Sequence, residues 1–177
     1  MKVLIIGGVA AGTKAAAKLK RQDRSAEVMI ITKDQDISYA GCGLPYYVGG
    51  MIEEREALIV NTPQKYSMLT GVEVRTGIEA VGLDADKKVV KARNLQAQAE
   101  EEYSYDKLII ATGASPSVPP AEGMQLTGVF RMRTPDDAIE VRSYAEERGV
   151  KKAVVVGAGF IGLEVAENLK ARGIQVT

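Results

Sequence analysis

Short, continuous runs of apolar residues, several of them ending at a glycine turn, dominate the hydrophobic pattern of the chain. Such runs are typical of strands that are buried on both faces of a parallel sheet. Segments rich in helix-forming residues separate several of them, as right-handed parallel crossovers require. The predicted buried strands are residues 2–6, 28–32, 72–75, 107–111, 152–156 and 174–176. The predicted helices are residues 10–24, a short helix beginning near residue 42, 63–69, 134–149 and 160–172.

The centre of the chain has a different pattern, which predicts antiparallel strands. Residues 78–83 and 88–93 flank the turn sequence Asp84-Ala85-Asp86, and together they predict a hairpin. A third antiparallel strand is expected near residues 102–105. The polar stretch 94–101 is predicted to be the loop that leads into it.

The plan of strand, glycine turn, helix and strand occurs at the N-terminus and again near the C-terminus. A proline-rich stretch at residues 114–120 lies between the two copies and predicts a domain boundary. We therefore expect a first domain over residues 1–115 and a second over residues 116–177. The second copy occupies only residues 154–177, which is too short to complete a parallel sheet. We expect the chain to be the N-terminal part of a longer protein.

Each copy carries a glycine pattern that is typical of dinucleotide binding. The second is a full G-x-G-x-x-G between a strand and a helix, with Gly157, Gly159 and Gly162. The first glycine permits the tight turn, the second permits close approach of a pyrophosphate, and the third permits close packing of the helix. In the first copy, residues 7–12, Val9 replaces the middle glycine. Thr32 stands where a carboxylate normally holds the adenosine ribose. The corresponding position of the second copy falls beyond Thr177, so NAD and NADP both stay open.

Charge and composition exclude several classes of function. The 177 residues include 23 basic and 23 acidic side chains, so the chain has no footprint for nucleic acid or an anionic membrane. It has no apolar stretch long enough to span a bilayer and no signal-peptide pattern, which predicts a cytoplasmic protein. The absence of histidine excludes a histidine triad or metal site within the chain, and the single cysteine excludes an internal disulfide or cysteine-rich zinc site. We therefore predict no metal.

The one cysteine, Cys42, lies between Gly41 and Gly43 at the predicted start of a short helix. A free cysteine is often a small buried hydrophobic residue. At a helix N-terminus, however, the thiolate form is favoured and the sulfur becomes a nucleophile. From the residues alone, a structural and a reactive role are both open.

Four segments together resemble the pyridine nucleotide-disulfide oxidoreductase family, and they are residues 7–12, 38–47, 111–113 and 157–164. The match is to its single-cysteine branch, which holds coenzyme A-disulfide reductases and NADH oxidases or peroxidases. The resemblance covers the whole chain. It implies an α/β fold, in which a doubly wound, Rossmann-like FAD-binding domain with a β-meander insertion precedes the start of an NAD(P)-binding Rossmann domain. It also implies a homodimer when the protein is full length.

The resemblance assigns roles to individual residues, with FAD and either NADH or NADPH as cofactors. Phe160 is expected to be an aromatic gate that moves aside for nicotinamide, although ordinary helix–sheet packing stays open for it. Glu164 is expected in the helix beside the flavin. The residues assigned to FAD are Gly7, Gly8, Val9, Ala10, Ala11, Gly12, Thr32, Lys33, Cys42, Val81, Ala111, Thr112 and Gly113. The residues assigned to NAD(P)H are Gly157, Gly159, Phe160, Ile161, Gly162 and Glu164.

Two departures from the family pattern bear on the substrate. Oxidase and peroxidase members commonly have a histidine where this chain has Ala10, which favours a disulfide over peroxide or oxygen. Lys14, Lys18 and Arg21 share one face of the first helix by their spacing. That face is either solvated or a cation cluster for the phosphates of coenzyme A. The residues expected to bind substrate are Lys14, Lys18, Arg21, Ser38 and Tyr39.

The expected function is an FAD-dependent NAD(P)H:disulfide oxidoreductase with Cys42 as the catalytic residue. Its substrate is predicted to be coenzyme A disulfide or a related persulfide or polysulfide. One alternative is an NADH oxidase or peroxidase that uses a sulfenic acid on Cys42. Another is an FAD-binding fragment that has no catalytic activity by itself.

Overall fold

The computed structural model describes residues 1–177 as two compact units. The first unit consists of Met1–Tyr39 and Ile59–Gly113, and the second of Ala40–Leu58 and Ala114–Thr177. The chain leaves the first unit where the proline-rich stretch begins, as expected for a boundary. Residues 40–58, however, pack with the C-terminal segment. The assignment of residues 1–115 and 116–177 to two cofactor domains stays a prediction.

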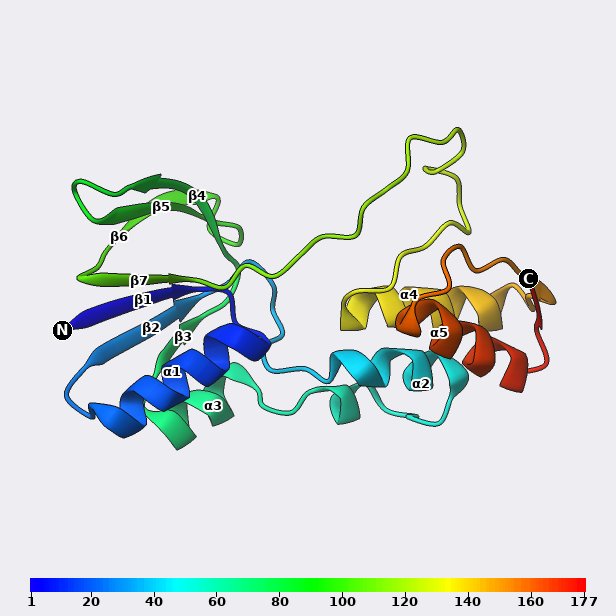
Figure 1. Cartoon of the computed structure of the whole chain (residues 1–177), viewed down its shortest axis with the longest axis horizontal. Coiled ribbons are helices and arrows are strands. Elements are labelled where there is room, and N and C mark those ends of the chain that lie inside the picture. The colour runs from blue at the N-terminus through cyan, green and yellow to red at the C-terminus, as the bar shows by residue number, and fades with distance from the viewer. The chain divides into compact units, whose positions relative to one another are not determined.

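A four-stranded parallel sheet forms the centre of the first unit (Figure 1). Its strand order is β3-β2-β1-β7, so the N-terminal strand lies inside the sheet. Helices α1 and α3 cover one face, and the antiparallel meander lies over the other (Figure 1). The bounds of these elements are β1 Lys2–Ile6, α1 Ala10–Gln22, β2 Glu27–Ile31, α3 Pro63–Thr70, β3 Glu73–Arg75 and β7 Lys107–Ile110. The predicted parallel strands and the two helices are confirmed, with ends that differ by one or two residues.

Alternate residues of the apolar runs fill two separate cores. Val3 and Ile5 of β1 face α1 and α3, whereas Leu4 between them faces the meander. Successive side chains of a strand point to opposite faces, so a continuous apolar run is needed where both faces are covered. Ile5 and Ile30 are completely buried. This double burial explains why the runs show no alternation of polar and apolar residues.

The meander consists of β4 (Ile78–Asp84), β5 (Val89–Asn94) and β6 (Ala99–Ser104) in that spatial order. The predicted loop over residues 94–101 was too long, because β6 already begins at Ala99. The acidic residues of β6 give this segment the polar composition of a loop. In the structure, however, Glu100 pairs with Arg93 and Glu102 pairs with Lys91 across the ladder between β5 and β6. Opposite charges in such cross-strand pairs stabilise a strand.

The second unit is built around α2 (Leu44–Gly49), which contacts both α4 (Pro135–Glu147) and α5 (Phe160–Ala171). Short 3₁₀ helices, η1 (Gly41–Gly43) and η2 (Arg55–Leu58), flank α2 in the sequence. The parallel strands β8 (Lys152–Ala153) and β9 (Gln175–Val176) form a separate two-stranded sheet. Of the predicted strand over 152–156, Lys152 and Ala153 pair with Gln175 and Val176, and the Val155 N–H donates to the Thr177 carbonyl oxygen at 2.9 Å. None of the helices combines the length and hydrophobicity needed to cross a bilayer.

Candidate functional site

The glycine turn of the first unit connects β1 to α1 in a conformation that only glycine suits. Gly7 has a φ of +109°, in a region that L side chains rarely adopt. A Cβ at Gly7 would lie 2.1 Å from the Ala111 carbonyl oxygen, and a Cβ at Gly12 would lie 1.9 Å from the Gly7 carbonyl oxygen. The first and last glycines of the motif therefore permit the close packing of β1, α1 and the end of β7.

Val9, which replaces the middle glycine, does not adopt a positive φ. It is the N-cap of α1 and has a φ of −96° and a ψ of −130°. Its counterpart in the second motif, Gly159, is the N-cap of α5 and has a φ of −74° and a ψ of 171°. Neither position therefore needs glycine for a positive φ, although the two residues differ in ψ.

The N-termini of α1 and α5 differ from those of the other two long helices. Neither has a side-chain cap or an acidic residue in its first turn. In contrast, Thr62 and Thr134 cap α3 and α4 through their side-chain oxygens, and each is followed by a proline. The first N–H groups of a helix have no partner within the helix, and the helix dipole favours an anion there. The two glycine motifs thus lead to the two helix ends that fit a phosphate.

The backbone brings Ser38 to the first glycine turn, although Ser38 lies 30 positions after Gly8 in the sequence. The Ser38 N–H donates to the Gly8 carbonyl oxygen at 3.0 Å, and its own carbonyl accepts from the Val60 N–H at 3.0 Å. Ser38 has a φ of +49°, and a non-glycine residue in this region is a sign of a functional or structural constraint. Tyr39 forms an isolated bridge with Ile59. This anchored turn is a candidate part of the site.

Thr32 follows β2 and is buried, with 6% of its surface exposed. Its methyl carbon would lie 3.2 Å from a Cβ placed on Gly8, so it packs beneath the glycine turn. The neighbouring Lys33 is exposed. A buried threonine cannot supply the carboxylate that usually holds a ribose. If a ribose binds at this edge of the sheet, a group other than Thr32 must hold it.

Four further predicted residues lie in the first unit, three of them directly after β7 and one in β4. Ala111 donates its N–H to the Ile6 carbonyl oxygen at 2.8 Å, and the exposed residues Thr112 and Gly113 follow. Val81 sits in a β-bulge of β4, where the register with β5 shifts between Ala80 and Gly82. Bulges often re-aim a side chain near a functional site, and the Val81 side chain is exposed.

The predicted basic face of α1 is present as three exposed side chains, Lys14, Lys18 and Arg21. Lys20 on the same helix has another role, since its ammonium group donates to the carbonyl oxygens of Arg24 and Ala26. Three exposed cations on successive turns of one helix form an anion-attracting surface. Exposure alone is equally compatible with a solvated face.

Cys42 belongs to the second unit, in the 3₁₀ turn that leads into α2, and its side chain is exposed. Gly43 beside it is buried, and a Cβ there would lie 3.1 Å from the Leu58 side chain. The local fold therefore buries the backbone after the cysteine and presents the thiol to solvent. Reactive cysteines are accessible, whereas structural ones are buried, so this arrangement favours the reactive role.

The second glycine motif repeats the geometry of the first. Gly157 has a φ of +112°, and a Cβ at Gly162 would lie 2.0 Å from the Gly157 carbonyl oxygen. Phe160 at the start of α5 is 89% exposed within residues 1–177. Ile161 is exposed, and Glu164 is half-buried one turn further along. An exposed aromatic ring at this helix end is available to contact a ligand.

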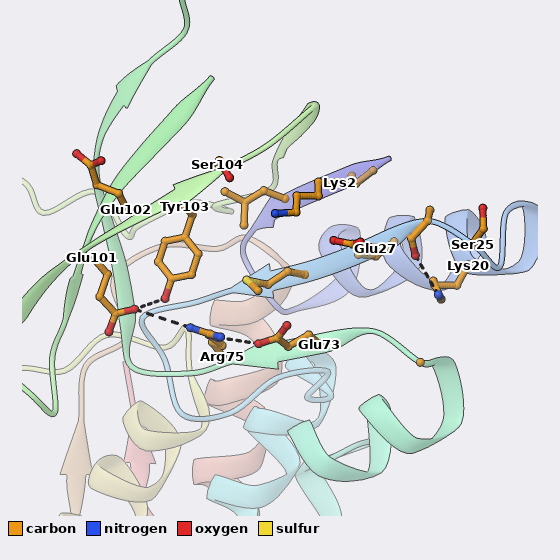
Figure 2. Close-up of a pocket in the computed structure, with 16 residues that line it drawn as sticks. Lys2, Lys20, Ser25, Glu27, Glu73, Arg75, Glu101, Glu102, Tyr103 and Ser104 are labelled. Atoms are coloured by element: carbon orange, nitrogen blue, oxygen red, sulfur yellow. Dashed lines mark hydrogen bonds and ion pairs between the residues drawn. The ribbon is translucent and has the colours of Figure 1, made fainter. Parts of the chain in front are cut away.

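A polar cluster that no sequence pattern predicted lies beneath the meander, where a cavity of about 830 Å³ opens (Figure 2). Arg75 bonds to Glu73 at 2.8 Å and lies 5.7 Å from the Tyr103 ring centre. Tyr103 donates to Glu101, and this hydrogen bond holds the pKa of the Glu101 carboxyl below its usual range. Burial, and then this same hydrogen bond, raise the pKa of Tyr103. The members come from β3 and β6, so no short sequence motif could have indicated the cluster.

The family model for pyridine nucleotide-disulphide oxidoreductases matches residues 1–177. An NADH oxidase of Methanocaldococcus jannaschii is 40% identical over 99% of this chain, and a coenzyme A disulfide reductase of Staphylococcus haemolyticus is 36% identical over 99%. This chain spans 39% of the length of each. The structure of an NAD-dependent persulfide reductase from A. fulgidus matches with a TM-score of 0.94 and 40% identity, covering 99% of this chain and 33% of that one.

Proposed function

Because the chain belongs to the pyridine nucleotide-disulphide oxidoreductase family, we propose that the protein is an FAD-dependent NAD(P)H:disulfide oxidoreductase with Cys42 as its catalytic residue. The observation that carries the proposal is the combination of two uncapped helix N-termini after glycine turns with one exposed cysteine. The substrate is coenzyme A disulfide or a related persulfide. Relatives of about the same identity carry the names of both kinds of reductase.

The first glycine turn fits the pyrophosphate of FAD. The exposed residues Ala10 and Ala11 leave room at the N-terminus of α1, where no side chain competes for the N–H groups. FAD bound there supplies a two-electron carrier between NAD(P)H and sulfur. Gly7, Gly12 and Thr112 are proposed to surround its adenosine diphosphate half, together with Gly8, Val9, Lys33, Ala111 and Gly113. Val81 and Thr32 belong to the same proposed set.

The second glycine turn fits the pyrophosphate of NADH or NADPH by the same geometry. Gly157, Gly159 and Gly162 form the turn, and no side chain caps the first N–H groups of α5. Phe160 and Ile161, both exposed, are proposed to contact the nicotinamide half, with Glu164 behind them. Oxidation of NAD(P)H provides the two electrons that cleave each disulfide.

Cys42 is proposed to exchange with the substrate disulfide. Its thiolate attacks one substrate sulfur, the S–S bond breaks, and the other half leaves as a thiolate that takes up a proton. The mixed disulfide that remains on Cys42 needs two electrons to release the second thiol and restore the thiolate. The sum is one disulfide and one NAD(P)H, with a proton, converted to two thiols and NAD(P)⁺.

The cationic face of α1 is the feature that favours coenzyme A as the thiol. Lys14, Lys18 and Arg21 offer charge-assisted contacts to phosphate groups, and Ser38 and Tyr39 lie in the anchored turn beside the glycine motif. A disulfide without phosphates would have no use for these cations. The full-length protein is further proposed to be a homodimer, as in the family that it resembles.

An NADH oxidase or peroxidase is the second candidate, and the 40% identical relative carries the name NADH oxidase. In that function Cys42 would cycle through a sulfenic acid and reduce oxygen or peroxide. Ala10 argues against it, because the chain has no histidine that could assist at the cysteine. A third candidate, an FAD-binding fragment without catalysis, applies if residues 1–177 act alone.

The test uses the flavin-loaded protein at the full length that its gene encodes. Two lost phosphate contacts of about 1.5–3 kcal/mol each would raise KM for coenzyme A disulfide about a hundredfold or more in Lys14→Ala with Arg21→Ala. Flavin reduction by NADH should stay nearly unchanged. Cys42→Ser should abolish disulfide turnover.

The control removes two exposed basic residues elsewhere in the first unit, Lys65→Ala with Arg93→Ala, and should leave KM unchanged. Turnover of hydrogen peroxide faster than of every disulfide tested would replace the proposal with the oxidase or peroxidase function.

A further inference from the structure

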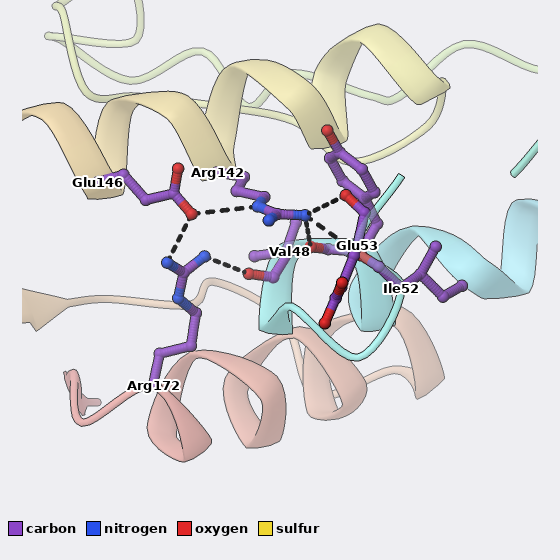
Figure 3. A network of polar contacts seen from close by, with 7 residues as sticks. Val48, Ile52, Glu53, Arg142, Glu146 and Arg172 are labelled. Carbon is purple, nitrogen blue, oxygen red and sulfur yellow. Dashed lines mark hydrogen bonds and ion pairs between the residues drawn. The ribbon is translucent and has the colours of Figure 1, made fainter. Parts of the chain in front are cut away.

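The C-terminal end of α2, the helix that follows Cys42, is held by two arginines from other helices (Figure 3). Arg142 of α4 donates from one nitrogen, Nη1, to the carbonyl oxygens of Tyr47 at 3.4 Å, Ile52 at 3.2 Å and Glu53 at 3.0 Å. Arg172, which follows α5, donates from Nη1 to the Val48 carbonyl oxygen at 3.0 Å. The last carbonyls of a helix have no partner within it, and cations there also complement the helix dipole.

One carboxylate oxygen orients both guanidinium groups. Glu146 accepts from Arg142 Nε at 3.1 Å and from Arg172 Nη2 at 2.7 Å. The Arg142 guanidinium also lies 4.7 Å from the centre of the Tyr47 ring. Both arginine side chains are half-buried, with 21% and 25% exposed, whereas the Glu146 side chain that links them is 46% exposed. Three helices therefore meet at the end of α2 through a connected set of charge-assisted bonds.

Cys42 lies just before the other end of α2, in the 3₁₀ turn Gly41–Gly43. The Gly43 N–H donates to the Ala40 carbonyl oxygen at 2.8 Å, and the Ala40 N–H donates to the Leu58 carbonyl oxygen at 2.7 Å. At the C-terminal end of α2, the absence of a side chain on Gly49 lets the backbone approach α5 closely. A Cβ at Gly49 would lie 2.2 Å from Oδ1 of Asn168 in α5. α2 has only six residues, so a shift at its C-terminal end moves Cys42 with it.

We infer that Arg142, Arg172 and Glu146 are positioning residues for the thiol of Cys42, which they hold by fixing the end of α2. The inference rests on the proposed function, in which Cys42 reacts with a substrate sulfur. Misplacement of a reacting atom by about 1 Å costs on the order of a hundredfold in rate. Loss of the clamp should therefore lower kcat rather than raise KM, since the proposed substrate contacts lie on α1.

The two arginines differ in a way that makes the inference testable. All three carbonyl contacts of Arg142 converge on a single nitrogen. A lysine ammonium group has three donors on one nitrogen, so Arg142→Lys can keep these carbonyl contacts, although it loses the separate bond from Nε to Glu146. Arg172 has only one such carbonyl partner, Val48, and contacts Glu146 through its other nitrogen. One ammonium group can keep one of these two bonds but not both, so Arg172→Lys should recover less of kcat than Arg142→Lys.

The experiment measures steady-state reduction of coenzyme A disulfide by the full-length, flavin-loaded protein, with stopped-flow reduction of the flavin by NADH beside it. Arg142→Ala and Arg172→Ala should each lower kcat about tenfold or more, with KM and flavin reduction within about twofold. Arg142→Lys should recover more of kcat than Arg172→Lys. Glu147 and Arg148 are exposed and lie at the C-terminal end of α4, directly after Glu146. The variants Glu147→Gln and Arg148→Ala serve as matched controls and should retain kcat.

Equal kcat in Arg142→Ala and Arg148→Ala would overturn the inference, as would equal recovery by the two lysine variants. If an alanine variant does not fold, the lysine pair still decides the question. Cys42→Ser separates this inference from the proposed function. Disulfide turnover that survives in Cys42→Ser refutes the proposed function. Loss of turnover there, with a normal kcat in both arginine variants, refutes only the positioning role.

Discussion

A negative charge placed at the N-terminus of α1 should change helix stability and FAD affinity in opposite directions. Ala10 is the first residue of α1 after the N-cap Val9, it is exposed, and its turn contains no acidic side chain. Ala10→Asp therefore fits without a clash. In the FAD-free protein, an acid in the first turn complements the helix dipole and should stabilise the fold by about 0.3–1 kcal/mol.

The same charge should weaken FAD binding, because the proposed pyrophosphate uses this helix end. Two like charges about 6 Å apart repel by about 0.7 kcal/mol at a dielectric constant of 80 and by about 2.8 kcal/mol at 20. A pyrophosphate carries two such charges, so even the lower value corresponds to about a tenfold rise in Kd. Ala10→Asn has nearly the same shape without the charge and is the matched control.

Titration of flavin fluorescence measures Kd, and thermal unfolding of the FAD-free protein measures stability. We expect Ala10→Asp to bind FAD at least about tenfold more weakly than Ala10→Asn while unfolding at an equal or higher temperature. Equal FAD affinity in the two variants would refute the assignment of this helix end to the pyrophosphate. A lower unfolding temperature of the aspartate variant would show that its effect on binding comes from damage to the fold.

Gly12→Ala should cost about 1–3 kcal/mol in the free energy of unfolding, because its Cβ would lie 1.9 Å from the carbonyl oxygen of the preceding turn. Gly41→Ala, where nothing lies within 4 Å, should change it by less than about 0.5 kcal/mol in urea titrations, and equal losses would contradict the packing argument. Hydrogen bonds from the two neighbouring arginines, that from Arg172 first, lower the pKa of Glu146 below its ordinary value of 4.5. Because the pKa of Glu146 is lower in the folded state than in the unfolded state, its ionised form stabilises the fold at pH 7, so wild type should unfold at a higher temperature than Glu146→Gln. The difference should begin to shrink near pH 4.5 and vanish only below the lowered pKa of the folded state. A difference that does not change with pH would show that the charge of Glu146 is not the cause.

Local patterns in the sequence were sufficient for most of the secondary structure. Apolar runs predicted the four strands of the parallel sheet, and Thr62 and Thr134 with their following prolines marked the starts of α3 and α4. These signals depend on residues that are close in the sequence, so they can be recognised without knowledge of the fold. The predicted start of β6 was wrong because its acidic residues are paired with basic residues of β5. These opposite charges become neighbours only when the two strands form a ladder.

The sequence by itself determined the two glycine turns, the single cysteine and the lack of histidine, because the backbone demands of a turn and the chemistry of a side chain belong to single residues. Tertiary structure alone decided that Cys42 is exposed, that Ser38 is hydrogen-bonded to Gly8, and that two arginines hold the end of α2. Arg142 lies about 90 residues from the carbonyls that it contacts. Contacts over such separations depend on how helices pack, and packing leaves no local pattern in the chain.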